Sequence, residues 1–78
     1  MWYVYILRCA DGQPYTGCTS DLRKRMTKHR DGQVMSTKSR LPVILVTYIA
    51  FSDKYMAYKF EKYLKSGSGR AFAKKRLY

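Results

Sequence analysis

The amino-terminal segment limits the fold most strongly, because its residue types are typical of extended structure. Residues 2–8 read Trp-Tyr-Val-Tyr-Ile-Leu-Arg, a run of aromatic and β-branched side chains that predicts a strand. Asp11-Gly12 then gives a turn signal, and residues 14–17 form a shorter second strand that begins at a proline. These segments predict a β-hairpin over residues 2–17.

The next segments alternate between helix, loop and strand. The sequence Thr19-Ser20-Asp21 places a hydroxyl cap before an acid and predicts a helix that runs to about Arg30 and ends near Gly32. Residues 33–41 are polar and basic without periodicity, which predicts a loop. Residues 43–51 are rich in Val, Ile and Tyr, and we expect them to form a third strand paired with the hairpin.

The last third of the chain predicts two helices. Ser52-Asp53 repeats the cap-and-acid pattern, and a helix follows to about Lys65 with an apolar stripe of Met56, Phe60 and Leu64. Residues 66–69 read Ser-Gly-Ser-Gly, which indicates a break before a short helix over residues 70–77. The order β-β-α-β-α-α predicts an α+β fold in one domain over residues 1–78. Its small, mainly antiparallel three-stranded sheet is flanked by helices.

The charge balance indicates the kind of partner. Sixteen Lys and Arg face five Asp and Glu, so the formal net charge is +11 on 78 residues. A polyanion would offset the self-repulsion, and nucleic acid is the first candidate and an anionic membrane the second. No apolar run is long enough to span a bilayer, and the amino terminus lacks the pattern of a signal peptide. Two cysteines are too few for a disulfide scaffold, so we expect a cytoplasmic location.

Four residues in the first half of the chain could carry chemistry. Tyr5 and Tyr15 stand on paired strands, which could bring two phenols to one rim of the sheet, although core packing is the alternative. Arg25 and His29 lie four residues apart and share a helical face. A guanidinium there suits a phosphate, whereas a surface Arg and a structural His are the plainer interpretations.

Glu61 is the only glutamate of the chain. Its helical angle places it at the border of the apolar stripe, away from Lys59 and Lys62. A carboxylate at that border either forms a salt bridge or binds a hard cation through oxygen. The residues alone leave both possibilities open.

The joint spacing of these residues resembles the GIY-YIG nuclease family. The segments Tyr3-Val4-Tyr5 and Tyr15-Thr16-Gly17 stand where that family has Gly-Ile-Tyr and Tyr-Ile-Gly. The tail from Glu61 to Arg70 looks like that of small bacterial members that consist of this domain alone, and the domain is similar to the amino-terminal nuclease domain of the excinuclease ABC complex. The positions that match the family pattern include Thr19, Asp21, Leu22, Arg25, His29 and Glu61. The sequence departs from the pattern at Tyr3, Thr16 and Cys18.

The resemblance implies a DNA endonuclease that hydrolyses phosphodiester bonds with one divalent metal ion, Mg²⁺ or Mn²⁺, in DNA repair or recombination. Glu61 would hold the metal and Arg25 would neutralise charge on the phosphoryl oxygens. We favour Tyr5 as the general base and Tyr15 as a phosphate or water contact, but the two roles could be exchanged. His29 would bond to a catalytic phenol or to the phosphate.

The expected partner is DNA, double-stranded or branched, with room for an additional protein partner. Contacts to the phosphate backbone position a duplex without reading its sequence. The residues expected to make them are Lys38, Arg40, Arg70, Lys74, Lys75 and Arg76. Two alternatives remain: a non-catalytic DNA-binding module that keeps the nuclease fold, and a domain that binds a membrane surface or another protein. Pure DNA binding gives no reason for a glutamate at position 61, which favours the enzyme.

Overall fold

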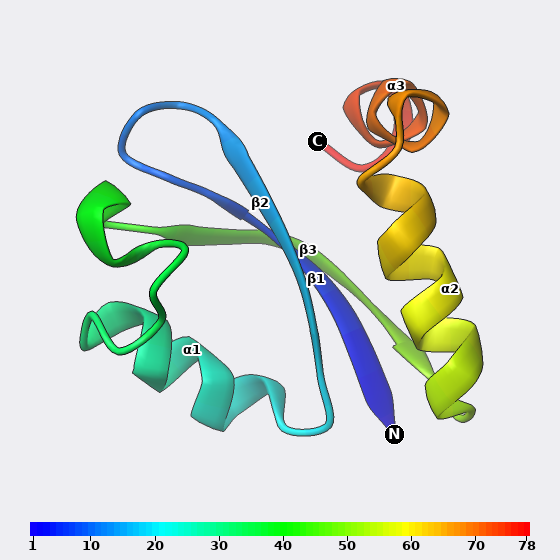
Figure 1. Ribbon diagram of the computed structural model, residues 1–78, viewed down its shortest axis with the longest axis horizontal. Helices are drawn as coiled ribbons and strands as arrows, with labels where there is room; N and C mark the ends of the chain where they lie inside the picture. The colour runs from blue at the N-terminus through cyan, green and yellow to red at the C-terminus, as the bar shows by residue number, and fades with distance from the viewer.

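The structure is a computed structural model that describes residues 1–78. Three strands form one antiparallel sheet in the order β2-β1-β3, with the hairpin strands β1 (Trp2–Arg8) and β2 (Pro14–Thr19) followed in sequence by β3 (Ile44–Phe51) (Figure 1). Tyr5 lies opposite Gly17 on β2 and opposite Tyr48 on β3. The predicted hairpin and its pairing with the third strand are therefore confirmed.

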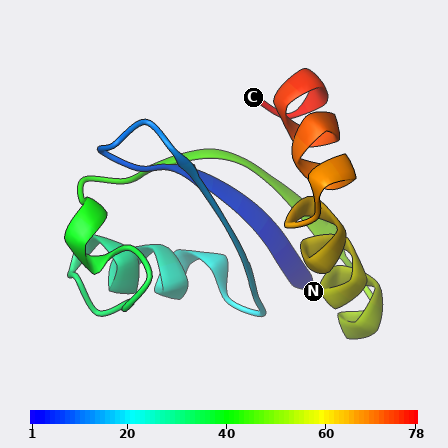
Figure 2. The ribbon, with the colours of Figure 1, turned by 45° about the horizontal axis from the view of Figure 1, so that its top comes forward.

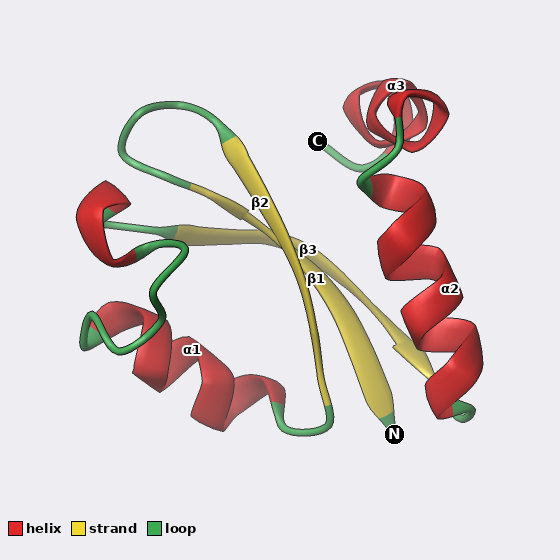
Figure 3. Cartoon of the chain, viewed as in Figure 1, coloured by secondary structure: helices red, strands yellow, loops and turns green.

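Helices cover both faces of the sheet, which confirms the predicted α+β class and element order. The helix α1 (Leu22–Arg30) lies on one face, and α2 (Lys54–Leu64) and α3 (Gly67–Arg76) lie on the other (Figures 1 and 3). A turned view shows the same two layers on either side of the strands (Figure 2). A short 3₁₀ turn, η1 (Lys38–Arg40), interrupts the predicted loop before β3. None of these helices has the length and apolar character that crossing a membrane requires.

The central strand β1 supplies side chains to two separate cores, because alternate residues of a strand point to opposite faces. Val4 and Ile6 pack with Ala57, Leu64 and Ala73 beneath α2 and α3. Tyr5 and Leu7 point the other way and form the second core. The other buried members of that core are Cys9, Met26 and Val43. Every side chain from Val4 to Leu7 is buried, so the site described below begins inside a rigid strand.

The helix starts differ from the prediction in which residue forms the cap. The acids themselves cap the helices: Asp21 accepts a hydrogen bond from the Lys24 N–H at 3.0 Å, and Asp53 accepts one from the Tyr55 N–H at 2.8 Å. The hydroxyl of Thr19 accepts a bond from the Asp21 N–H at 3.1 Å, so it closes the turn before α1 instead. Neither helix has an acid in its first turn.

The apolar stripe of α2 and the start of α3 also need correction. Met56 is 50% exposed, and Ala57 takes the buried position because the face that meets the sheet runs through Ala57, Phe60 and Leu64. The expected break at residues 66–69 belongs largely to α3. Ser66 caps that helix by accepting a bond from the Gly69 N–H at 3.2 Å. A side chain at Gly69 would overlap the carbonyl oxygen of Tyr63, so the glycine permits close helix packing.

Candidate active site

Two phenols and the imidazole form a compact cluster on the α1 face of the sheet. Tyr15 lies directly across the hairpin from Leu7, two residues beyond Tyr5, so both tyrosines point to the same face. Their ring centroids lie 6.4 Å apart. The ring of His29 stands edge-on to both, with centroid distances of 5.6 Å to Tyr5 and 5.5 Å to Tyr15. The structure thus brings together three of the predicted catalytic residues.

The Tyr5 hydroxyl is fixed by close contacts on two sides. Its oxygen lies 2.8 Å from Nε2 of His29, within hydrogen-bonding distance. On the other side it lies across the backbone of Gly17, where a Cβ atom would overlap the phenol. Sequence spacing identified Gly17 as part of the motif, and the structure supplies the physical reason for a residue without a side chain.

His29 has a second buried partner that the sequence did not indicate. Its Nδ1 lies 2.7 Å from the hydroxyl oxygen of Thr37. Tyr5, His29 and Thr37 all have an exposed fraction of 0%. Thr37 comes from the loop between α1 and β3, where a single threonine in a polar segment carries no signal of burial.

Burial changes the acid–base properties of this cluster. The pKa of Tyr5 rises to about 12, first because the phenol is buried and then because Tyr15 stands beside it, while the Arg25 guanidinium partly opposes the change. Burial, with a smaller contribution from Arg25, lowers the pKa of His29 below its usual value. At neutral pH the site therefore holds a protonated phenol next to a neutral imidazole.

Glu61 approaches the cluster from α2 without a hydrogen bond to any of the other four residues. Its carboxylate pairs with Lys65 one turn later, with 3.1 Å between Nζ and Oε2. The salt bridge considered from the sequence is therefore present, but the Lys65 side chain is 51% exposed, which makes it a surface pair of small energetic value. The charge of Glu61 reaches the cluster, because it contributes to raising the pKa values of Tyr5 and Cys18.

The donor set at Glu61 fits Mg²⁺ or Mn²⁺ better than a soft metal. No group of three His, Cys, Asp or Glu side chains gathers anywhere in the chain, which argues against a closed site made only of protein ligands. Mg²⁺ keeps several water ligands and binds through one or two carboxylates together with substrate phosphates. A partly exposed carboxylate whose one partner is a mobile ammonium group meets that requirement.

Two hollows adjoin the cluster. One, of about 360 Å³, is lined by Tyr15 together with Lys65 and Arg70. The other, of about 320 Å³, holds Arg25 between Lys24 and Lys28 and has no hydrophobic lining. Cations thus stand on both sides of the cluster, an arrangement that suits a polyanion crossing it.

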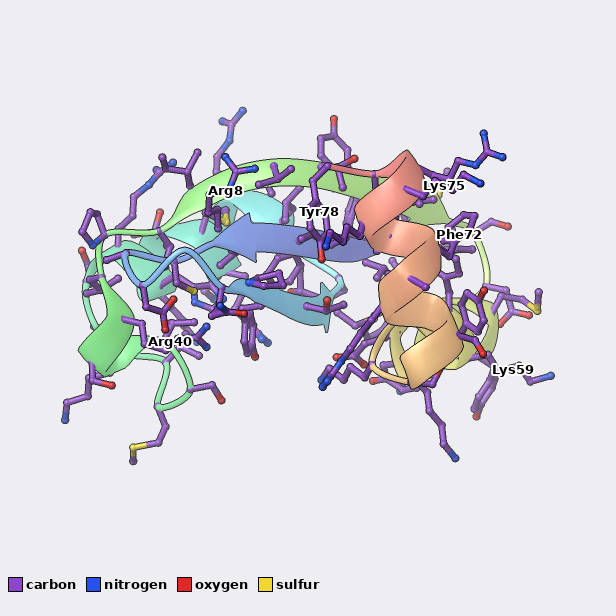
Figure 4. All side chains as sticks on the ribbon, turned by 90° about the horizontal axis from the view of Figure 1, so that it is seen from above. Arg8, Arg40, Lys59, Phe72, Lys75 and Tyr78 are labelled. Atoms are coloured by element: carbon purple, nitrogen blue, oxygen red, sulfur yellow. The ribbon has the colours of Figure 1, made fainter.

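The predicted phosphate contacts occupy different surroundings. Arg40 pairs with Asp11, with 2.9 Å between Nε and Oδ2, and ties η1 to the turn of the hairpin (Figure 4). Arg70 and Lys74 line a third hollow of about 590 Å³ between the hairpin and α3. Arg8, which the sequence interpretation did not include, lines the same hollow, and Figure 4 shows it on the side of the molecule that carries Tyr78. The remaining predicted contacts, Lys38, Lys75 and Arg76, are exposed.

Comparison with known proteins gives a consistent result. A family model described as the GIY-YIG catalytic domain matches residues 1–76. A UPF0213 protein of Staphylococcus saprophyticus is 45% identical over 67 residues, which cover 85% of this chain and 82% of that protein. A UPF0213 protein of Streptococcus agalactiae serotype V is 39% identical over 70 residues, which cover 88% of this chain and 80% of that protein. The solution NMR structure of a UPF0213 protein from Bacillus halodurans matches with a TM-score of 0.62 at 36% identity. That match covers 99% of this chain and 87% of the other.

Proposed function

Because the chain belongs to the GIY-YIG family, a family of nuclease type, we propose that it is a metal-dependent endonuclease that hydrolyses DNA phosphodiester bonds. The observation that carries the proposal is the cluster of Tyr5, Tyr15 and His29 beside Arg25, with the charge of Glu61 reaching it from α2. A non-catalytic DNA-binding surface gives no reason to hold a phenol against an imidazole inside the protein.

In the proposed site Arg25 receives the scissile phosphate. Its guanidinium is partly buried and lies in the hollow flanked by Lys24 and Lys28, where a phosphate would be drawn by three positive charges. A planar guanidinium can bind two phosphoryl oxygens at once and oppose the charge that develops on them. Tyr15, which lines the neighbouring hollow with Lys65 and Arg70, is assigned a contact to the same phosphate or to the attacking water.

Tyr5 is assigned as the general base that acts through His29. A phenol with a pKa of about 12 is almost never ionised at neutral pH, so its proton needs an acceptor at the moment of reaction. The neutral imidazole at 2.8 Å provides one, whereas the hydroxyl of Tyr15 has no hydrogen-bond partner in the protein. When the phosphate draws Arg25 away, the Tyr5 oxygen can take a proton from water as its own proton moves to His29.

Glu61 is the proposed ligand of the divalent ion. When bound there, Mg²⁺ or Mn²⁺ would supply Lewis-acid stabilisation to the phosphoryl and leaving oxygens. Lys65 must then leave the carboxylate, which is a small cost for an exposed ion pair. Its ammonium group also lines the hollow beside Tyr15, so it remains available to a phosphate.

We further propose a duplex or branched DNA substrate and a role in repair or recombination. The +11 charge and the cations on both sides of the cluster support a polyanionic substrate. The two cysteines are both free, in keeping with the cytoplasmic location proposed from the sequence. Backbone contacts are proposed for Lys38, Arg70, Lys74, Lys75 and Arg76, with Arg40 available once its pair with Asp11 opens. We propose that residues 1–78 act as one domain.

A cleavage assay with supercoiled, branched and single-stranded DNA, with and without Mg²⁺, tests the proposal. We expect metal-dependent cleavage by the parent chain and none by the Glu61→Gln variant, whose DNA affinity should stay equal or rise because a negative charge near the phosphates is removed. Lys65→Gln is the control, since it breaks the same ion pair but keeps the carboxylate, and it should still cleave.

One observation favours a second candidate, a DNA-binding module without catalysis. The Lys65–Glu61 pair already neutralises the carboxylate without a metal ion. In that case the parent chain would bind DNA but cut none of the three substrates with Mg²⁺ or Mn²⁺. Glu61→Gln and Lys65→Gln would then lower the free energy of unfolding by similar small amounts, because each removes the same contact.

A further inference from the structure

A continuous chain of two hydrogen bonds runs inside the protein from Thr37 through His29 to Tyr5. The distances are 2.7 Å from the Thr37 hydroxyl to Nδ1 and 2.8 Å from Nε2 to the Tyr5 hydroxyl. All three residues have an exposed fraction of 0%, so water does not compete for these groups. Both ring nitrogens are therefore occupied by hydroxyls that can donate or accept.

The chemistry of the two hydroxyls decides the direction of the chain. A neutral imidazole carries one N–H and one acceptor nitrogen, and the partner of one nitrogen sets the state of the other. The phenol of Tyr5 is a far stronger acid than the aliphatic alcohol of Thr37, and the positive charge of Arg25 strengthens it as a donor. Tyr5 therefore donates to Nε2, and Nδ1–H donates to the oxygen of Thr37.

We propose that Thr37 is a positioning residue that holds His29 in the Nδ1–H tautomer and so keeps Nε2 free to take the proton of Tyr5. The inference rests on the nuclease function proposed above and extends it. In the step concerned, the O–H bond of Tyr5 breaks as an N–H bond forms at Nε2. The products are a Tyr5 phenolate and a His29 imidazolium. Both N–H groups of that imidazolium then have acceptors, the phenolate on one side and the Thr37 oxygen on the other.

The opposite tautomer would block this step. With hydrogen on Nε2, the imidazole could only donate to Tyr5, and the phenolic proton would have no acceptor. Because a relay of this kind needs one tautomer, loss of Thr37 should reduce the rate of cleavage without removing any group that touches DNA. The same loss should change which nitrogen of His29 carries hydrogen.

The chain offers a direct measurement because His29 is its only histidine. In protein labelled with ¹⁵N-histidine, the two ring nitrogens give one pair of signals, and an N–H nitrogen is well separated from an unprotonated one. We expect the parent chain to show hydrogen on Nδ1 and none on Nε2 at neutral pH. Thr37→Val, which replaces the hydroxyl with a methyl group, should move the hydrogen to Nε2.

Cleavage of DNA with Mg²⁺ is measured on the same samples. Thr37→Val should slow cleavage by about tenfold or more, the lower range of a lost proton transfer. Thr37→Ser keeps the hydroxyl and should restore both the tautomer and the rate. The matched control is Thr27→Val on α1, whose hydroxyl bonds to the Arg23 carbonyl at 3.2 Å and does not touch His29. It should leave both measurements unchanged.

Two results would overturn the inference: hydrogen on Nε2 in the parent chain, or a Thr37→Val protein that keeps the parent tautomer. A tautomer that moves in Thr37→Val while the cleavage rate stays at the parent value would overturn the role in the reaction. If Thr37→Val does not fold, Thr37→Ser and the parent spectrum still decide the tautomer. If the parent tautomer is as expected but no DNA is cut, the nuclease function fails and the structural assignment of Thr37 stands.

Discussion

At the scale of single residues, Gly17 shows how a side chain that is absent can position one that is present. The Tyr5 phenol occupies the space that a Cβ atom at position 17 would need. We predict that Gly17→Ala lowers the free energy of unfolding by about 1–3 kcal/mol, the usual cost of overpacking, because a central strand leaves little room for adjustment. Chemical denaturation measures this cost, and a variant as stable as the parent would contradict the packing described here.

The same displacement should affect the reaction. If Tyr5 is pushed out of line with His29, the cleavage rate of Gly17→Ala should fall even in the folded fraction. Tyr5→Phe serves as the reference because it removes the hydroxyl without adding volume, and the base assignment predicts a loss on the order of 10²-fold or more. A larger loss for Tyr15→Phe than for Tyr5→Phe would exchange the roles of the two phenols.

His29 makes the stability of the fold depend on pH. Its folded-state pKa is lowered by burial, so below its ordinary value near 6.5 the unfolded chain takes up a proton that the folded chain refuses. The stability contribution of neutral His29 is thus complete above that value and is lost as pH falls toward the folded-state pKa. We predict that the free energy of unfolding falls between about pH 7 and pH 5.5 by up to roughly 1.4 kcal/mol per pH unit. Urea titrations at both pH values test this, and His29→Gln should lose most of the dependence.

The residues of the site divide into those that periodicity can place and those that it cannot. Tyr5 and Tyr15 were predicted to meet because paired strands fix their side chains to one face, and Arg25 and His29 because a helix repeats every 3.6 residues. Thr37 and its contact with His29 were missed, since the path of a loop between two elements follows from tertiary packing. Arg8 was missed for a related reason: its surroundings depend on where α3 docks.

At the scale of the elements, the two glycines at the start of α3 have opposite roles. Gly69 packs where a Cβ atom would overlap the Tyr63 carbonyl, whereas the corresponding position at Gly67 meets no atom within 4 Å. We predict that Gly69→Ala destabilises the protein by about 1–3 kcal/mol, while Gly67→Ala leaves stability unchanged or raises it by up to about 1 kcal/mol through better helix propensity. The pair is matched, since each adds one methyl group to the same helix. Equal effects on the unfolding midpoint would mean that α3 does not dock against α2 as described.

The helix that these glycines begin also shows where sequence patterns stop being informative. Four residues reading Ser-Gly-Ser-Gly have low helix propensity and were interpreted as a break, yet Gly67 to Gly69 form the first turn of α3 because Ser66 caps it and Gly69 allows it to pack. Tertiary packing can override a propensity of about 1 kcal/mol per glycine. The strands and the extents of α1 and α2 were predicted correctly because each carries both a periodic pattern and a start signal.

At the scale of the whole molecule, the positive charge is spread over the surface but its placement is uneven. Arg70 and Lys74 line hollows beside the hairpin, and Arg70 shares one of them with Tyr15. Lys59 and Lys62 lie on the exposed side of α2, and Figure 4 shows Lys59 at the end of the molecule far from Arg40. If the DNA crosses the candidate active site, only the first pair should contact its phosphates.

This difference gives a test in which net charge is held constant. We predict that affinity for duplex DNA falls steeply as salt rises from about 50 to 200 mM, because each phosphate contact releases counterions. The double variant Arg70→Gln/Lys74→Gln should reduce the slope of log affinity against log salt by about 0.9 for each lost contact. Lys59→Gln/Lys62→Gln removes the same two charges from the α2 surface and should leave the slope close to that of the parent. Fluorescence anisotropy with a labelled duplex at several salt concentrations gives all three slopes. Equal changes in both double variants would show that DNA binding follows the total charge of the protein, and a flat salt dependence in the parent would contradict a phosphate-binding surface altogether.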